Sequence, residues 1–324
     1  METELSNDAS QFNAISVTVA PSNRSTEWPT VALLVTYFVV WMSVVLLHDA
    51  IPAPVQVVLL VPLGGLWMSL GHELLHGHPT RWNRVNSAIG SIPLSLWLPF
   101  SRYKELHIKH HLSDLTDPED DPESFYVPPP SWHQASPWRR RYFLLLRTAP
   151  GRLTLGVPRG ILRFWRREYR LAGSGGIIGP WAFHLAACAV FGFWLFGVVG
   201  FNPLVYVVGF SLGGASCTQL RSFVEHCAVA QGTRSAVVKA SPPMGLLFLN
   251  NNLHHTHHAV PQLAWYRIPS LHREIGADAL ADQGAGLYSG GYLEVVRTYF
   301  FTPFCQPDHP LSPGARPYGS RGIS

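Results

Sequence analysis

The sequence stands out for its histidines, of which there are 16 in 324 residues. Three short segments hold most of the clustered ones: residues 71–78 read GHELLHGH, residues 107–111 read HIKHH, and residues 254–258 read HHTHH. A further histidine, His226, follows a long apolar run. Imidazole is a good ligand for iron, zinc, copper and nickel. The clustering therefore predicts a metal site built from histidine side chains.

Helical spacing would bring these histidines onto common faces. Residues three or four apart lie on one side of a helix, as His72 and His76 do, and the motif H-x-x-H-H repeats that spacing in the other two segments. Neighbouring residues diverge by about 100°, so the adjacent pair in each motif can serve two different ions. One ion cannot use this many imidazoles, so two ions are predicted. The candidate ligands are His72, His76, His107, His110, His111, His226, His254, His257 and His258.

The remaining histidines are weaker candidates. His78 is expected to lie off the helical face of the first segment, and His255 could be either a ligand or a hydrogen-bonding neighbour of one. None of the three segments contains a cysteine or methionine, which disfavours a copper(I) site. Surface or hydrogen-bonded positions are expected for the isolated histidines His48, His133, His184, His272 and His309.

Two other classes of protein also place histidines near membrane helices. The sequence from His72 to His76 fits the H-E-x-x-H motif of zinc metalloproteases, with Glu73 as the general base. That interpretation leaves the segments at residues 107–111 and 254–258 without a role. A metal transporter would place ionisable ligands near the middle of its spans, whereas the apolar runs here are nearly free of them apart from His184.

Four apolar runs are the elements that must position the histidines. About 20 apolar residues cross the hydrocarbon core of a bilayer as a helix. Charged residues make up only 14% of the chain, against about a quarter in a soluble domain. The pattern predicts an all-α integral membrane protein with two transmembrane helical hairpins and a cap that carries the histidines. The expected spans are about residues 31–47, 55–70, 177–199 and 201–217.

The polar segment between the two hairpins has three recognisable parts. Residues 89–100 are apolar but interrupted by prolines, and we expect them to lie in the membrane interface. Carboxylates that could hydrogen-bond the histidines, or simply belong to a solvated loop, are Asp114, Asp117, Asp120 and Asp121. A helically spaced basic face, which could rest on anionic headgroups or be an ordinary solvated face, consists of Arg163, Arg166, Arg167 and Arg170.

Composition divides the chain into three parts. Residues 1–30 are a polar leader, residues 31–270 hold the apolar runs and the histidine segments, and residues 271–324 are a tail rich in Gly and Pro. From Gly276 onward we expect irregular structure, apart from a short helix near residues 292–301. The 4 cysteines are scattered without a C-x-x-C pair, which predicts neither a disulfide framework nor a zinc ribbon.

The order of the three histidine segments around four apolar runs resembles the membrane-bound fatty acid desaturase and hydroxylase superfamily. Its three histidine boxes correspond here to His72/His76, His107/His110/His111 and His254/His257/His258, and His226 resembles an extra ligand of some members. The likeness covers roughly residues 30–270. Residues 71–82, 117–124 and 250–269 are similar to a bacterial branch that includes dihydrorhizobitoxine desaturase. A neighbouring bacterial type hydroxylates the acyl chains of ornithine lipids.

This resemblance implies a pair of ferrous ions that uses O2 to oxidise an unactivated C–H bond of a lipid acyl chain or related amphiphile. Desaturation is the first expectation, and hydroxylation is the alternative. The chain lacks the H-P-G-G motif of an appended cytochrome b5 module. A separate electron donor is therefore expected, such as a ferredoxin or a cytochrome with its reductase. No nucleic-acid partner is expected.

Loop charge predicts the orientation of the spans. The turns near residues 50 and 200 contain no Lys or Arg, whereas residues 71–176 and 218–324 contain nearly all of them. Cytoplasmic loops carry the Lys/Arg excess, so both termini and every histidine segment should face the cytoplasm, at a bacterial inner membrane. Reporter fusions at residue 50 or residue 201 should then report the outer side. A cytoplasmic signal from these fusions would contradict the four-span arrangement.

Overall fold

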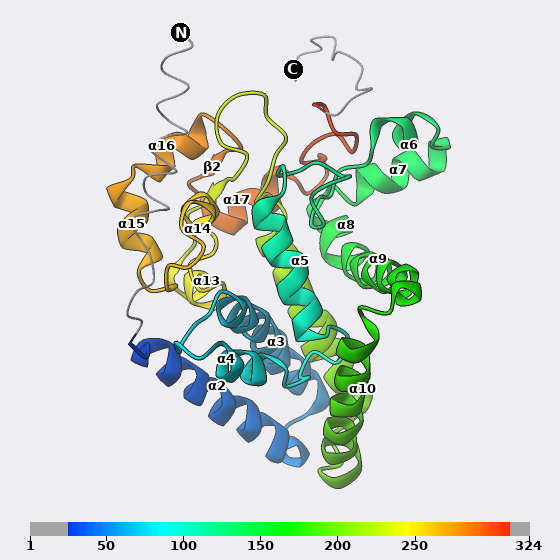
Figure 1. Cartoon of the computed structure of the whole chain (residues 1–324), viewed down its shortest axis with the longest axis vertical. Coiled ribbons are helices and arrows are strands. Elements are labelled where there is room, and N and C mark those ends of the chain that lie inside the picture. The colour runs from blue at the N-terminus through cyan, green and yellow to red at the C-terminus, as the bar shows by residue number, and fades with distance from the viewer. Residues whose placement is uncertain (1–24, 312–324) are drawn as a thin grey trace.

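The chain folds mainly into helices of very different lengths (Figure 1). The structure is a computed structural model, and it describes residues 25–311. Most of the predicted leader, residues 1–24, and the last part of the tail, residues 312–324, lie outside the described residues. Two short strands, β1 (Val237–Val238) and β2 (Leu287–Tyr288), pair in parallel.

Long helices form one end of the molecule, the lower end in Figure 1. The first pair consists of α2 (Trp28–Leu46) and α3 (Ala53–Leu75), joined by the 3-10 turn η1 (His48–Ala50). In the second pair, α10 (Ile178–Gly192) continues into the π-helical turn η3 (Phe193–Val198). Its partner segment consists of α11 (Pro203–Tyr206), the π-helical turn η4 (Val207–Leu212) and α12 (Gly213–Arg221).

Shorter helices, most of them at the other end, come from the segments that follow each pair (Figure 1). After the first pair come α4 (Asn83–Gly90), α5 (Phe100–Leu112), α6 (Pro129–His133), α7 (Pro137–Leu145), α8 (Ala149–Thr154), α9 (Gly156–Leu171) and the 3-10 turn η2 (Ala172–Ser174). After the second pair come α13 (Pro242–Leu247), α14 (His254–Ala259), α15 (Ile268–Glu274), α16 (Ala277–Asp282) and α17 (Gly291–Thr298).

Three helices among residues 25–311 are long and apolar enough to cross a membrane: Trp28–Leu46, Ala53–Leu75 and Ile178–Val198. Their apolar side chains face outward to a large extent, and Val190 and Phe193 are each 73% exposed. A continuous apolar surface of this kind indicates contact with a membrane. The three helices overlap the first three expected spans, which makes the chain an integral membrane protein.

The fourth expected span, residues 201–217, is not among the helices with the length and apolarity of a span. The segment is helical, because α11, η4 and α12 follow one another without a gap. However, α12 ends in the polar sequence SCTQLR. Its polar residues Ser216, Thr218 and Gln219 are half-buried, and α12 packs against α3 and α9.

Facing glycines allow α12 to pack closely against α3. A Cβ atom on Gly214 would lie 2.7 Å from the Cα of Gly64, and one on Gly64 would lie 2.2 Å from the carbonyl oxygen of Phe210. Small residues at a crossing point let the backbones of membrane helices approach each other. The contact fixes the middle of α3, about two turns before the first histidine segment, against the helix that leads to His226.

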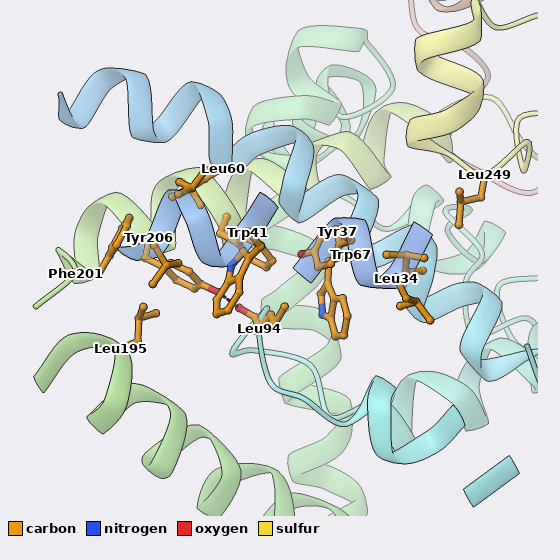
Figure 2. Packing of buried hydrophobic residues seen from close by; sticks show 14 residues of the cluster. Leu34, Tyr37, Trp41, Leu60, Trp67, Leu94, Leu195, Phe201, Tyr206 and Leu249 are labelled. Carbon is orange, nitrogen blue, oxygen red and sulfur yellow. Dashed lines mark hydrogen bonds between the residues drawn. The ribbon is translucent and has the colours of Figure 1, made fainter. Parts of the chain in front are cut away.

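Aromatic side chains fill the space between the two pairs of long helices (Figure 2). Trp41 of α2 stacks on Phe191 of α10 with ring centroids 6.1 Å apart. Tyr206 donates a hydrogen bond to the carbonyl oxygen of Leu94 at 3.0 Å. Residues 89–100 therefore pack against the second pair of helices, and their expected position in the membrane interface stays a prediction.

A buried ion pair connects α5 with α9. Arg102 donates to Glu168 through Nε at 2.7 Å and through Nη2 at 3.0 Å, which is the two-pronged geometry of a strong guanidinium–carboxylate pair. Trp181 of α10 donates to the same carboxylate at 3.0 Å. The second histidine segment is thereby fixed relative to α9 and α10.

The expectation of an irregular tail is wrong for residues 277–288. Helix α16 and strand β2 form there, and β2 pairs with β1. Gly276, with φ of 61°, supplies the left-handed backbone that links α15 to α16. The expected short helix is present as α17, whose Val295 is buried in the core. Composition did not indicate this packing, because tertiary contacts stabilise these short elements.

Gly214→Ala should destabilise the protein, because the added methyl group would meet the backbone of Gly64. Overpacking of this kind costs about 1–3 kcal/mol, so thermal unfolding in detergent should have a lower midpoint than in the wild type. Gly179→Ala is the matched control, since a Cβ atom there meets no atom of residues 25–311 within 4 Å. An unchanged midpoint for Gly214→Ala would contradict the close α3–α12 contact.

Candidate metal centre

The first histidine segment lies where α3 ends. The helix continues through Leu75, so His72 belongs to its last turn and His76 is its C-cap residue. Their ring centroids are 4.7 Å apart. The ring of His107 on α5 lies 4.5 Å from that of His72 and 5.1 Å from that of His76. The first and second segments therefore meet.

Helix α5 points its three histidines in two directions. The Nε2 atoms of His107 and His111 lie 3.1 Å apart. The Nε2 atom of His110 lies instead 3.1 Å from that of His226. The pair four residues apart thus shares one face, and His110 is turned away from it, as the helical repeat requires.

Helix α14 also divides its histidines between two directions, but its pair lies with the single histidine of α5. His254 and His258 have Nε2 atoms 3.1 Å apart, and that of His254 is 3.0 Å from the Nε2 atom of His226. His257 crosses over to the other side, where its Nε2 atom lies 3.1 Å from that of His111. Each of the two helices therefore contributes a pair of histidines to one group and a single histidine to the other.

The structure gathers all nine candidate ligands into two groups, and within each group the potential ligand atoms lie within 4.8 Å of one another. The first group is His72, His76, His107, His111 and His257, and the second is His110, His226, His254 and His258. Each group could hold a metal ion. The Nε2 atom of His76 is buried and has no hydrogen-bond partner among residues 25–311, as expected for a ligand atom.

Burial keeps most of these imidazoles neutral. Burial, reinforced by neighbouring imidazoles, lowers the pKa of His257 and of His258 well below the ordinary value, and burial lowers the pKa of His226 to about 3. A neutral imidazole offers the lone pair that a metal ion needs. His110 differs, because burial lowers its pKa but the Glu123 and Asp121 carboxylates outweigh burial and raise it.

Two carboxylates support the second histidine segment from behind. Nδ1 of His107 lies 2.8 Å from Oε1 of Glu123, and Nδ1 of His110 lies 2.8 Å from Oδ1 of Asp121. A carboxylate that accepts a hydrogen bond from Nδ1 leaves Nε2 as the ligand atom and fixes the plane of the ring. Both rings are thus oriented toward the histidine groups before any ion binds.

Asn251 and Glu225 support the third segment. Oδ1 of Asn251 lies 3.1 Å from Nδ1 of His254, and its Nδ2 lies 3.5 Å from Nε2 of His72, so this side chain contacts both groups. Oε1 of Glu225 lies 3.5 Å from Nδ1 of His254 and 3.4 Å from Nε of Arg221. Glu123, Glu225 and Asn251 were not among the residues predicted to support the histidines. Their closeness in sequence to histidines was a weak signal, since acidic and amide residues are common in loops.

Asp121 alone, of the four aspartates considered, contacts a histidine of the two groups within residues 25–311. Asp114 forms an ion pair with Arg234, and Asp120 forms one with Lys109. Asp117 accepts a hydrogen bond from the backbone N–H of Glu119 at 2.8 Å. These three belong to the solvated acidic loop that was the alternative interpretation.

His78 and His255 belong to neither group. Nδ1 of His78 lies 2.7 Å from Oε1 of Glu27, and Nδ1 of His255 lies 2.9 Å from Oγ1 of Thr233. Side-chain or backbone hydrogen bonds also engage four of the five isolated histidines, His48, His184, His272 and His309.

Glu73 does not lie where the base of a zinc protease would be. Its carboxylate accepts a hydrogen bond from the backbone N–H of Trp265 at 3.2 Å, and it is in neither histidine group. His72 and His76 share their group with histidines of α5 and α14, which the protease interpretation left without a role. The geometry therefore disfavours that interpretation.

A cavity of about 280 Å³ borders the second group. His226, Glu123 and Glu225 form part of its wall, and much of the remainder is apolar, including Leu106 of α5 and Ile161 of α9. Binding sites for small molecules are typically apolar with a few placed polar groups. This cavity is suited to a hydrocarbon segment that must approach the histidines.

Comparison with known proteins identifies a matching family and two relatives from one genus. The family model "Fatty acid desaturase" matches residues 51–290, a range that contains all nine histidines of the two groups. A beta-carotene ketolase of Paracoccus sp. (strain N81106 / MBIC 01143) is 27% identical over 224 residues, which are 64% of this chain and 76% of the relative. A second beta-carotene ketolase, of Paracoccus sp. (strain PC1), is 27% identical over 264 residues, which are 76% of this chain and 92% of the relative.

Asp121→Asn and Glu123→Gln should each weaken metal retention, because His110 and His107 would lose the anionic partner of Nδ1. Losses of such partners typically cost about 10–100-fold in metal affinity. Metal content per chain, measured after dialysis against increasing chelator, tests this. Asp120→Asn is the control, since Asp120 contacts Lys109 and no histidine of the groups. Equal retention in all three variants would contradict the supporting role.

Proposed function

We propose, on the premise that this chain belongs to the fatty acid desaturase family, that it holds two iron ions and uses O2 to oxidise an unactivated C–H bond of a lipid acyl chain or related amphiphile. One observation carries the proposal: two groups of five and four histidines, each drawing on both α5 and α14. The family match and the ketolase relatives make the chain an oxidoreductase. The metal, the substrate and the product belong to the proposal.

The donor atoms fit iron. All nine candidate ligands are imidazoles, and imidazole binds ferrous iron well. The count of five and four per group leaves positions free for O2 or solvent on an ion that takes up to about six ligands. Two ferrous ions, when bound, would supply the activation of O2 and the oxidising power for C–H cleavage.

The protein's own residues orient the site and keep it dry. Asp121 and Glu123 hold the Nδ1 protons of His110 and His107, which directs their Nε2 lone pairs inward. The amide of Asn251 contacts His254 and His72, and so holds one histidine of each group in a fixed position relative to the other. Burial of the histidines limits the entry of bulk water, which would quench a strong oxidant.

Two products are compatible with this site. Desaturation removes two hydrogens from neighbouring carbons and, with O2, two electrons and two protons, releases two waters. Hydroxylation inserts one oxygen atom into a C–H bond and releases one water for the same inputs. The position of the substrate carbon decides between them, since a displacement of about 1 Å can change a rate a hundredfold. We propose desaturation first and hydroxylation of a lipid acyl chain as the alternative.

The two relatives point to a third possible product, a ketone formed from a methylene group. Both are named as beta-carotene ketolases, and forming a ketone from a methylene group requires oxygen insertion. This observation supports oxygenation as the second candidate function for this chain, on a carotenoid or another long hydrocarbon. A separate electron donor, a ferredoxin or a cytochrome with its reductase, completes either reaction.

We also propose that α11, η4 and α12 form a fourth span. The two pairs of long helices would then be hairpins, with both termini and the histidine groups on the cytoplasmic side of a bacterial inner membrane. The Lys/Arg asymmetry of the loops supports this orientation.

The purified protein should contain about two irons per chain. His110→Ala and His257→Ala should each lower the iron content and abolish product, because each removes a proposed ligand of one group. His133→Ala is the control, since His133 lies outside both groups. One zinc per chain, with activity that survives iron chelation, would contradict the proposal, and so would Glu73→Gln being inactive while His110→Ala turned over normally.

Mass spectrometry of lipids and carotenoids, with the gene present and absent, identifies the reaction. Loss of two hydrogens from an acyl chain would indicate desaturation. A gain of one oxygen would indicate hydroxylation, and an oxygen in place of two hydrogens would indicate a ketone. No change in any of these compounds, in a strain that supplies iron and reductant, would contradict an oxidase.

A further inference from the structure

A basic groove adjoins the cavity that borders the second histidine group. The groove has a volume of about 830 Å³ and is lined by α7 and α9. Its wall includes five arginines: Arg159, Arg163, Arg166, Arg167 and Arg170. Arg163 and Arg167 also line the smaller, mainly apolar cavity. Two side chains on successive turns of α9 therefore stand between the two spaces.

Among the residues that the structure describes, none in the wall of the groove is acidic. Glu168, the acidic residue of α9, is buried and pairs with Arg102 on the other side of the helix. Among residues 25–311, no carboxylate forms an ion pair with any of the five arginines of the groove. Asp121 and Glu168 act on Arg163 and Arg167 only from beyond ion-pair distance, so the five guanidinium groups attract an anion from outside the chain.

Charge in the smaller cavity is distributed differently. Apart from the shared Arg163 and Arg167, its cation is Arg221, which is already paired with Glu225 at 3.4 Å, and Glu123 adds a second carboxylate to the wall. The part of the cavity near His226 therefore offers no unpaired arginine to an anion, whereas Val157, Ile161 and Phe164 of α9 offer an apolar wall to a hydrocarbon chain. One helix thus presents an apolar face to the cavity and a basic face to the groove.

Arg163 and Arg167 are available to bind an anion. Arg163 is exposed and uses Nη1 to donate to the carbonyl oxygen of Ser124 at 3.0 Å, which anchors the side chain and leaves its other N–H groups free to donate. Arg167 is half-buried, one turn further along. Guanidinium groups bind carboxylate and phosphate oxygens through paired hydrogen bonds.

We infer that the substrate is an amphiphile whose anionic headgroup, a carboxylate or a phosphate, binds Arg163 and Arg167 in the groove while its hydrocarbon chain enters the cavity beside His226. This inference rests on the proposed function and adds the substrate class. It sets this chain apart from an enzyme for a neutral hydrocarbon. The position of α9 next to the end of the apolar helix α10 (Figure 1) places the groove where a lipid headgroup would lie.

Competition binding tests the inference without requiring turnover. A spin-labelled stearic acid binds the purified full-length protein in nonionic detergent, and hexadecanoate, hexadecyl phosphate or hexadecanol competes for it. The anionic competitors should displace the label about 10–100-fold more strongly than the alcohol, as expected for charge-assisted hydrogen bonds. The stronger of the two anions identifies the headgroup as a carboxylate or a phosphate. Equal competition by all three compounds would overturn the inference.

Arginine variants locate the anion. R163Q/R167Q, and to a smaller extent R163Q and R167Q alone, should lose the preference for anions while hexadecanol competes as before, which also shows that the cavity is intact. R139Q/R141Q removes the same charge from α7 outside the groove wall and should retain the preference. Preference retained in R163Q/R167Q and in both single variants, or lost equally in R139Q/R141Q, would overturn the inference.

The two proposals can fail separately. Anion preference in a protein that contains no iron and yields no oxidised product would support the headgroup site but contradict the proposed oxidase. Oxidation of a neutral hydrocarbon by a protein without anion preference would support the proposed oxidase and contradict the headgroup site. Loss of binding to phosphatidylglycerol vesicles in R163Q/R167Q, with the preference for hexadecanoate unchanged, would show that α9 rests on the bilayer and would also overturn the inference.

Discussion

Two adjacent histidines on a helix cannot point at the same ion, and the arrangement of the site follows from this restriction. The pairs His110/His111 and His257/His258 diverge by about 100° on their helices. α5 and α14 must therefore lie side by side with their histidines interleaved, so that each helix serves both groups. A shift of either helix by one residue would misplace histidines of both groups at once.

The rest of the fold holds those two helices and the end of α3 in place. Glycine contacts between Gly64 and Gly214 let α3 and α12 approach closely, which brings His72 and His226 into the same region. The buried pair of Arg102 and Glu168 fixes α5 against α9. Membrane-facing helices thus act as a rigid base, and the histidines gather at one end of it.

Polar groups around the histidines serve two separate purposes. Asp121 and Glu123 accept hydrogen bonds from histidine Nδ1 atoms and so define the ligand atoms. The arginines of α9 line the groove next to the apolar cavity, two of them at its boundary, and form no ion pair with a carboxylate among the described residues. Negative charge near the histidines and positive charge away from them would favour one orientation of an amphiphile, with its chain toward the site and its head outside.

The sequence by itself determined the helical class, three of the membrane helices and the nine histidines that gather, because hydrophobic runs and helical spacing are local properties. It also identified the basic face of α9, though not the groove beside it. Only the tertiary structure decided which histidines share a group, that Glu123 rather than Asp114 supports one, and that residues 277–288 pack instead of forming an irregular tail. These outcomes depend on contacts between residues far apart in the chain, such as Asn251 with His72, which no local pattern encodes.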